Sequence, residues 1–81
     1  MEKVVNYLIM ENLEVGYEQV HMLGLQDDLR CIGMNSITAI KMAVMIEKNF
    51  NITIDDDDLF FENYVSKSSI IGLLKKYKVI E

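Results

Sequence analysis

Several residue types are scarce in this chain, and their scarcity limits what it can do. Among 81 residues there is no proline and no tryptophan, with one cysteine, Cys31, and one histidine, His21. A single cysteine cannot form an internal disulfide, and we expect Cys31 to be a buried thiol. One cysteine and one histidine cannot assemble a metal cluster or a Cys-His or Ser-His-Asp catalytic set. The sequence therefore argues against a metal centre and against a catalyst.

Two kinds of phosphate or cation loop are also missing. No glycine-rich phosphate-binding loop occurs among the four glycines. The acidic run Asp55 to Asp58 is no calcium loop, because such a loop needs glycine at its sixth position and glutamate at its twelfth. Counting from Asp55, these positions hold Phe60 and Ser66.

The charge and hydropathy patterns exclude two classes of partner. The net charge of −5 argues against nucleic acid, whose phosphate backbone attracts clustered lysine and arginine. No basic segment followed by a continuous apolar run is present, so neither a signal peptide nor a membrane span is expected. We expect a cytoplasmic monomer without a membrane partner.

Length and composition favour one small helical domain over residues 1–81. Apolar residues make up 51% of the chain and proline is absent, which indicates a packed and mostly helical fold. A domain of this size buries only about 60% of its unfolded surface, so a large enclosed active site is not expected.

Apolar periodicity divides the chain into helical segments. It predicts helices over 2–14 and 36–49, a short helix over 55–61, and a last helix beginning after an N-cap at Ser66. The segment 16–35 reads as a long loop pinned by leucines. The expected fold is all-α: an antiparallel four-helix bundle with a long first loop and one short helix.

The chain is organised around the end of that loop. Gly33 allows a backbone conformation that is closed to residues with a Cβ atom, and Asn35 is a strong N-cap. If Asn35 caps the following helix, the Ser36 hydroxyl is released to face solvent near the positive end of the helix dipole. This is a good position for a phosphate group.

The helix that follows is apolar on two sides. One arc is assigned to the core and contains Ala39, Met42, Ala43, Ile46 and Phe50. Ile37, Ile40 and Val44 lie roughly opposite. Because full burial of a helix is difficult in so small a bundle, the second stripe predicts a docking surface for a partner.

Three stretches of the sequence resemble the acyl and peptidyl carrier protein family. Asp28-Leu29, Ile32-Gly33 and Ser36-Ile37 are similar to the family's attachment motif. Ile46-Glu47, Phe50, Ile52 and Ile54 are similar to the signature after its second helix. Glu62-Asn63-Tyr64, Ser66 and Ile70 follow in register with the entry to its last helix, and no gap is needed from Asp28 to Leu74.

The resemblance implies a substrate carrier that is not an enzyme. Its cofactor would be 4'-phosphopantetheine, transferred from coenzyme A to Ser36 and carrying acyl or aminoacyl groups as thioesters. The implied partners are a phosphopantetheinyl transferase, an adenylating ligase or acyltransferase, and a condensing enzyme or thioesterase. The residues expected at the docking surface are Met34, Asn35, Ile37, Ile40, Lys41, Val44, Glu47 and Lys48.

Departures from the family pattern suggest the pathway. Asn35 stands where fatty-acid carriers commonly have aspartate before the serine, and Lys41 stands where they usually have an acid. Both favour a freestanding carrier of nonribosomal peptide or polyketide biosynthesis over a fatty-acid carrier. Lys67 stands where valine or a similar residue is common, so the start of the last helix is expected to pack differently.

Three readings remain open from the residues. The first is the carrier. The second is a helical interaction module that binds through Ile37, Ile40 and Val44, with Ser36 only structural. The third is a small hydrolase subunit using His21, which lacks a second catalytic group.

Overall fold

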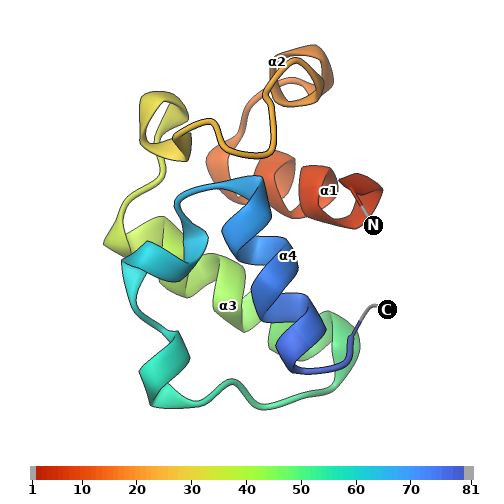
Figure 1. The fold of residues 1–81 in the computed structure, drawn as a ribbon, viewed down its shortest axis with the longest axis vertical. Coiled ribbons are helices and arrows are strands. Elements are labelled where there is room, and N and C mark those ends of the chain that lie inside the picture. The colour runs from red at the N-terminus through yellow and green to blue at the C-terminus, as the bar shows by residue number, and fades with distance from the viewer. Residues whose placement is uncertain (1, 80–81) are drawn as a thin grey trace.

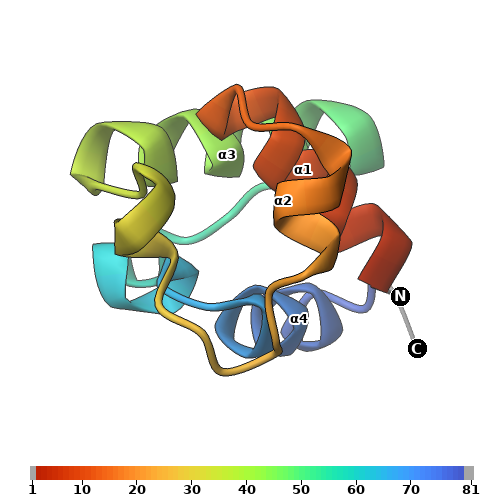
Figure 2. The same cartoon turned by 90° about the horizontal axis from the view of Figure 1, so that it is seen from above.

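Three long helices build the domain. In the computed structural model, which describes residues 2–79, they are α1 (Glu2–Leu13), α3 (Ser36–Phe50) and α4 (Lys67–Lys76). α1 contacts both α3 and α4, and it lies beside α3 in one layer with α4 beneath (Figures 1 and 2). Every element of the described range is helical, which confirms the all-α bundle.

The short elements differ in part from expectation. One short α-helix, α2 (Tyr17–His21), lies within the long first loop and packs against α1. The short helix predicted over 55–61 is wrong: the chain there forms the 3₁₀ turns η2 (Asp56–Asp58) and η3 (Phe61–Tyr64). Asp55 precedes η2 and Phe60 precedes η3, and both residues have extended backbone. The extended residue Phe60 separates the two turns, so they do not join into one helix.

The limits of the first and third helices lie close to those predicted. α1 ends one residue earlier than expected because Glu14 adopts a left-handed conformation with φ of 54°. α3 ends at Phe50, one residue later than expected, and Asn51 follows in the same left-handed conformation with φ of 54°. Asparagine tolerates this conformation better than most residues, which makes it a natural helix stop.

One apolar core joins the elements. Its buried residues are Val5, Leu8 and Ile9 of α1, Ala39, Met42, Ala43 and Ile46 of α3, Ile70, Leu73 and Leu74 of α4, and Val20, Leu29, Met34, Ile54 and Tyr64 between them. Four of the five residues assigned to the core face of α3 are fully buried, and the fifth, Phe50, is half-buried against the same cluster. The predicted inward face of α3 is therefore confirmed.

The long first loop is anchored to the beginning of α4. Lys67 is fully buried, and its Nζ donates hydrogen bonds to the carbonyl oxygens of Val20 (2.8 Å) and Leu23 (2.9 Å). The expectation that Lys67 changes the packing at the start of α4 agrees with this arrangement. Two backbone bonds join the same segments, from Leu29 N to Val65 O (2.8 Å) and from Ser68 N to Leu25 O (3.0 Å).

A second set of polar contacts attaches η2 to the end of α4. The buried Asp58 carboxylate accepts hydrogen bonds from Lys76 Nζ (2.9 Å to each oxygen) and from the Tyr77 hydroxyl. The hydrogen bonds from Lys76 and then Tyr77 lower the pKa of Asp58 below its ordinary value. Burial raises the pKa of Tyr64 to about 12, so its hydroxyl stays protonated and donates to the Asp58 carbonyl oxygen (3.0 Å).

These contacts make the domain sensitive to acid through Asp58. The pKa of Asp58 is lower in the folded state than in the unfolded state. Its contribution to the free energy of unfolding is therefore complete when the pH is above the unfolded-state pKa, and it is lost as the pH falls through the folded-state pKa. We expect Asp58→Asn to lower the urea midpoint at neutral pH and to flatten its decline between about pH 5 and pH 2. Asp57→Asn, at an exposed neighbour, is the control; an equally steep acid decline in both variants would contradict this assignment.

Candidate functional site

The segment before α3 begins with a capped 3₁₀ turn. η1 (Leu29–Ile32) has Asp28 as its N-cap, whose Oδ1 accepts a hydrogen bond from Arg30 N (2.9 Å). The Arg30 guanidinium also binds the Asp28 carboxylate, with an Nη2 to Oδ2 distance of 2.6 Å. This hydrogen bonding lowers the pKa of Asp28. Leu29 anchors the turn by inserting its side chain into the core.

Gly33 turns the chain from η1 into α3. Its φ of 109° lies in the region that favours glycine, as the sequence predicted. The next residue, Met34, donates its N–H to Leu29 O (3.0 Å) and places its side chain in the core. The turn is therefore fixed from both ends before the helix starts.

Asn35 caps α3, which confirms the sequence prediction. Its Oδ1 accepts hydrogen bonds from the backbone N–H groups of Ile37 (2.9 Å) and Thr38 (3.0 Å). The Thr38 hydroxyl oxygen accepts a hydrogen bond from Asn35 N (2.7 Å), which completes a reciprocal capping box. Sequence reasoning did not identify Thr38, although its place three residues after an asparagine cap is a recognisable signal.

Ser36 is the first residue of α3 and is exposed. No hydrogen bond to its hydroxyl is found within residues 2–79. The free amides of the first turn, those of Ile37 and Thr38, are instead bound by the Asn35 side chain. No acidic residue occurs in the first turn of α3. The site therefore presents an accessible hydroxyl at the positive end of a helix dipole, with no neighbouring carboxylate on that turn to oppose an anion.

An apolar stripe follows Ser36 along the outside of α3. Ile37 is 69% exposed, Ile40 51% and Val44 42%. Lys41 and Lys48 are exposed on the same helix. We call the three apolar residues together with these two lysines the α3 surface.

Two residues expected at the docking surface have other roles. Met34 is only 3% exposed and belongs to the core. Glu47 is half-buried, and its carboxylate accepts a hydrogen bond from Ile54 N (2.8 Å), which attaches the chain after α3 to that helix. Both side chains serve the fold, and we leave them out of the α3 surface.

Two residues that the sequence analysis considered for other roles are Cys31, on η1, and His21, on α2. Cys31 is exposed, so the expectation of a buried thiol is wrong; in η1 it is Leu29 that faces the core. His21 lies on α2, where its ring stacks on Tyr17 at 5.4 Å between ring centroids. Within residues 2–79 no group of three or more His, Cys, Asp and Glu side chains could hold a metal ion. None of the helices described there could cross a membrane.

Comparison with known protein families gives one match. The family model described as "Phosphopantetheine attachment site" matches residues 8–74, which covers most of the chain. The chain belongs to this phosphopantetheine-attachment family of carrier proteins. No curated protein and no solved structure matches it.

Family membership establishes the cofactor and the general role. A carrier of this family holds a covalently attached 4'-phosphopantetheine. Carriers of this type are generally acyl carriers without catalytic activity of their own, and they work with a phosphopantetheinyl transferase and with biosynthetic enzymes. The match covers α3 and the turn before it, so the geometry described above lies within the carrier domain.

Gly33 holds a backbone conformation that a residue with a Cβ atom adopts only with strain. A Cβ atom placed there meets nothing within 4 Å, so the cost of Gly33→Ala is conformational. We expect a loss of about 1–3 kcal/mol in the free energy of unfolding, measured by urea denaturation. Gly16→Ala is the control, because Gly16 has ordinary extended backbone and equally open space. Equal losses in the two variants would contradict the role of the Gly33 conformation.

Proposed function

We propose that Ser36 is the residue to which phosphopantetheine is attached. The observation that carries this proposal is that Ser36 alone among the four serines of the chain is exposed. Ser66 is buried and caps α4, with its Oγ hydrogen-bonded to Ser69 Oγ (3.0 Å), and Ser68 is half-buried. Ser36 is therefore the serine that is most accessible to a transferase.

The surroundings of Ser36 fit a phosphate ester. Its Oγ would attack the phosphorus of coenzyme A that carries the pantetheine arm, and the pyrophosphate P–O bond would break to release adenosine 3',5'-bisphosphate. The N-terminal dipole of α3 would favour the negative charge of the phosphodiester that forms. No carboxylate or imidazole belongs to the first turn of α3, so a base that removes the hydroxyl proton must come from the transferase. When bound, phosphopantetheine supplies a terminal thiol that carries acyl or aminoacyl groups as thioesters.

The α3 surface is proposed as the docking site for the transferase and for the enzymes that load, condense or release the cargo. Its apolar residues begin directly beside Ser36 and are too exposed to serve the core. Covalent attachment raises the effective concentration of the cargo at each partner, so a small and weak contact area is sufficient. Asn35, Lys41 and Lys48 at the margin would select partners by charge and hydrogen bonding.

The proposed pathway is secondary metabolism, of nonribosomal peptide or polyketide type. The support is the charge of α3: its first turn lacks acids, and Lys41 adds positive charge beside Ile40. Partners that dock here would present neutral or acidic surfaces, whereas the carboxylate-rich helix of a fatty-acid carrier suits basic partners. The alternative is a fatty-acid carrier, which would be revealed by loading and extension of acyl groups with the enzymes of fatty-acid synthesis.

Attachment can be tested by mass spectrometry of the intact protein. After incubation with coenzyme A, Mg²⁺ and a broad-specificity phosphopantetheinyl transferase, we expect wild type to gain one phosphopantetheinyl group. Ser36→Ala should gain none and should keep its stability, because an exposed hydroxyl contributes little to folding.

Ser68→Ala is the matched control and should be modified like wild type. Modification of Ser36→Ala would place the site elsewhere. A failure of folded wild type to react, with a known carrier loaded in the same assay, would argue for an interaction module instead.

The α3 surface is tested by changing one of its residues. We expect Ile40→Glu to lower kcat/KM for modification by about tenfold, which corresponds to about 1.4 kcal/mol of lost binding. The fold should persist because the side chain is half exposed. Met22→Glu, at a residue of the first loop that is 83% exposed, is the control. Equal rates for the two variants would show that α3 does not contact the transferase.

A further inference from the structure

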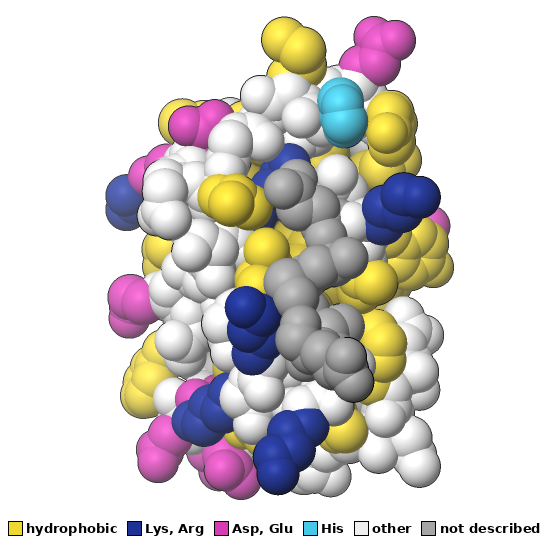
Figure 3. Space-filling model, turned by 45° about the vertical axis from the view of Figure 1, so that its right-hand side comes forward, with side chains coloured by type: hydrophobic (Ala, Val, Ile, Leu, Met, Phe, Trp, Pro, Cys, Tyr) yellow, Lys and Arg dark blue, Asp and Glu magenta, His cyan; other side chains and the backbone are white. Residues whose placement is uncertain are grey.

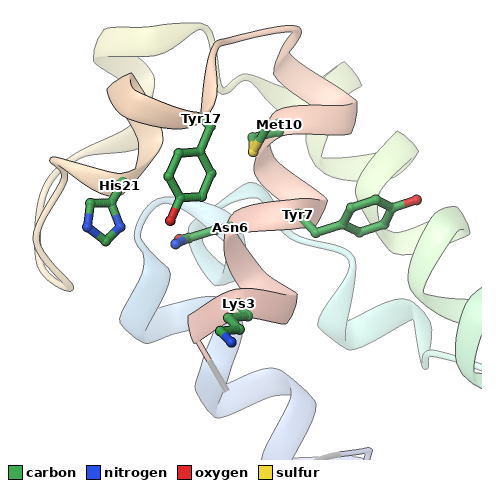
Figure 4. A pocket seen from close by; sticks show the side chains of 6 residues that line it. All are labelled: Lys3, Asn6, Tyr7, Met10, Tyr17 and His21. Carbon is green, nitrogen blue, oxygen red and sulfur yellow. The ribbon is translucent and has the colours of Figure 1, made fainter.

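The groove between α1 and α2 does not include the turn that carries Ser36. Its lining residues all belong to these two helices, among them Lys3, Tyr17 and His21 (Figure 4). Figure 3 shows the single histidine at the top of the molecule, the end at which α2 lies in Figure 1. No residue from Gly33 to Thr38 lines this groove. The contacts that orient Ser36 are therefore to be sought within its own turn.

The Thr38 hydroxyl lies within hydrogen-bond distance of each of the three residues before Ser36. Its oxygen accepts a hydrogen bond from Asn35 N (2.7 Å). The acceptors within reach of its proton include Asn35 O at 3.0 Å, Met34 Sδ at 3.4 Å and Gly33 O at 3.5 Å. Because a hydroxyl carries a single proton, these acceptors are alternatives to one another. One side chain thus holds the segment from Gly33 to Asn35 against the first turn of α3.

Thr38 is itself restrained. The residue is half-buried, and branching at its Cβ atom limits the side chain to few rotamers. A threonine hydroxyl in a helix reaches back to a carbonyl of the preceding turn, which here is Asn35 O. The Asn35 side chain adds a hydrogen bond from its Nδ2 to Gly33 O (3.3 Å). The backbone that leads into Ser36 is therefore tied to α3 through both Thr38 and Asn35.

Transfer of phosphopantetheine depends on the position of the Ser36 hydroxyl. In the proposed reaction the bond from Ser36 Oγ to phosphorus forms while the pyrophosphate P–O bond of coenzyme A breaks, and the hydroxyl proton passes to a base of the transferase. A misplacement of reacting atoms by about 1 Å can lower a rate about a hundredfold. No hydrogen bond to the Ser36 hydroxyl is found in the described part of the chain, so its alignment comes from the backbone on which it stands.

We propose that Thr38 is a positioning residue for phosphopantetheine transfer, because its hydroxyl fixes the Asn35 backbone and thereby presents Ser36 Oγ to the transferase in one place. This inference rests on the proposed attachment at Ser36. Thr38 is not part of the α3 surface, so its effect falls on the transfer step. The α3 surface determines how tightly the transferase binds, whereas Thr38 determines how fast the bound carrier reacts.

The test is single-turnover modification of the full chain with coenzyme A, Mg²⁺ and an excess of transferase, followed by intact-protein mass spectrometry. Thr38→Val keeps the branched shape of the side chain and removes the hydroxyl. We expect its maximal rate to fall by about tenfold, while the transferase concentration that gives half of the maximal rate changes little. Ile40→Glu should show the opposite pattern. Thr38→Ser restores the hydroxyl and should recover most of the lost rate.

Amide exchange and a stability control separate positioning from folding. Because Asn35 is exposed, water can replace the lost hydroxyl, so Thr38→Val should fold and its Asn35 amide should exchange with solvent faster than in wild type. Thr38→Ala, with a residue that favours helix more than valine does, is a second variant and should be slowed equally. Asp58→Asn loses contacts between η2 and the end of α4 and should react at the wild-type rate.

The outcomes distinguish this inference from the attachment itself. Unchanged maximal rates in Thr38→Val and Thr38→Ala, with Ser36→Ala unreactive, would overturn the role of Thr38 and leave the attachment at Ser36 standing. An equal loss of rate in Asp58→Asn would also overturn that role, because reduced stability would then be the cause. Modification of Ser36→Ala would overturn both proposals.

Discussion

The structure depends on the buried ammonium of Lys67. Removing this charge from water costs several kcal/mol, and the cost is tolerated only because two carbonyl oxygens of the α2 segment, Val20 O and Leu23 O, accept its hydrogen bonds. The same bonds satisfy carbonyl groups at the end of a helix too short to be stable alone. One side chain of α4 thereby determines the path of a loop that precedes it by more than forty residues.

The geometry of the site follows from that path. Because backbone bonds also hold Leu25 and Leu29 against the start of α4, η1 has a defined position when the chain reaches Gly33. The left-handed glycine and the Asn35 cap then allow only one direction for α3. Ser36 is exposed, yet it stands on a backbone fixed from both sides. The proposed attachment at Ser36 would benefit from this arrangement, since a transferase would find the hydroxyl in one defined place.

Local signals could be predicted from the sequence, and signals that depend on distant neighbours could not. Gly33 predicts a turn and Asn35 predicts a helix cap from the properties of each residue alone. The apolar periodicity of α3 places Ala39 on the core face and Ile40 on the exposed face. The burial of Met34 and the exposure of Cys31 depend on how η1 is oriented against the core. No short sequence pattern predicts that orientation. Four consecutive aspartates suit a helical first turn by charge, but the extended backbone at Phe60 divides that segment. The role of Lys67 depends on the passage of α4 beneath α2, which the sequence does not reveal. From the sequence one could note only that a lysine stands where valine or a similar residue is common.

The two faces of α1 have different neighbours. Val5, Leu8 and Ile9 are committed to the core and hold α1 against α3 and α4. Lys3, Asn6 and Met10 of the same helix line the groove beside α2. α2 is a single short helix that is held by the buried side chain of Val20 and by the hydrogen bonds of Lys67. Among the elements described, α1 is the one that makes an extensive contact with α2. Because α2 leads into the anchored loop and then to η1, its contact with α1 helps to fix the path of the chain to Ser36.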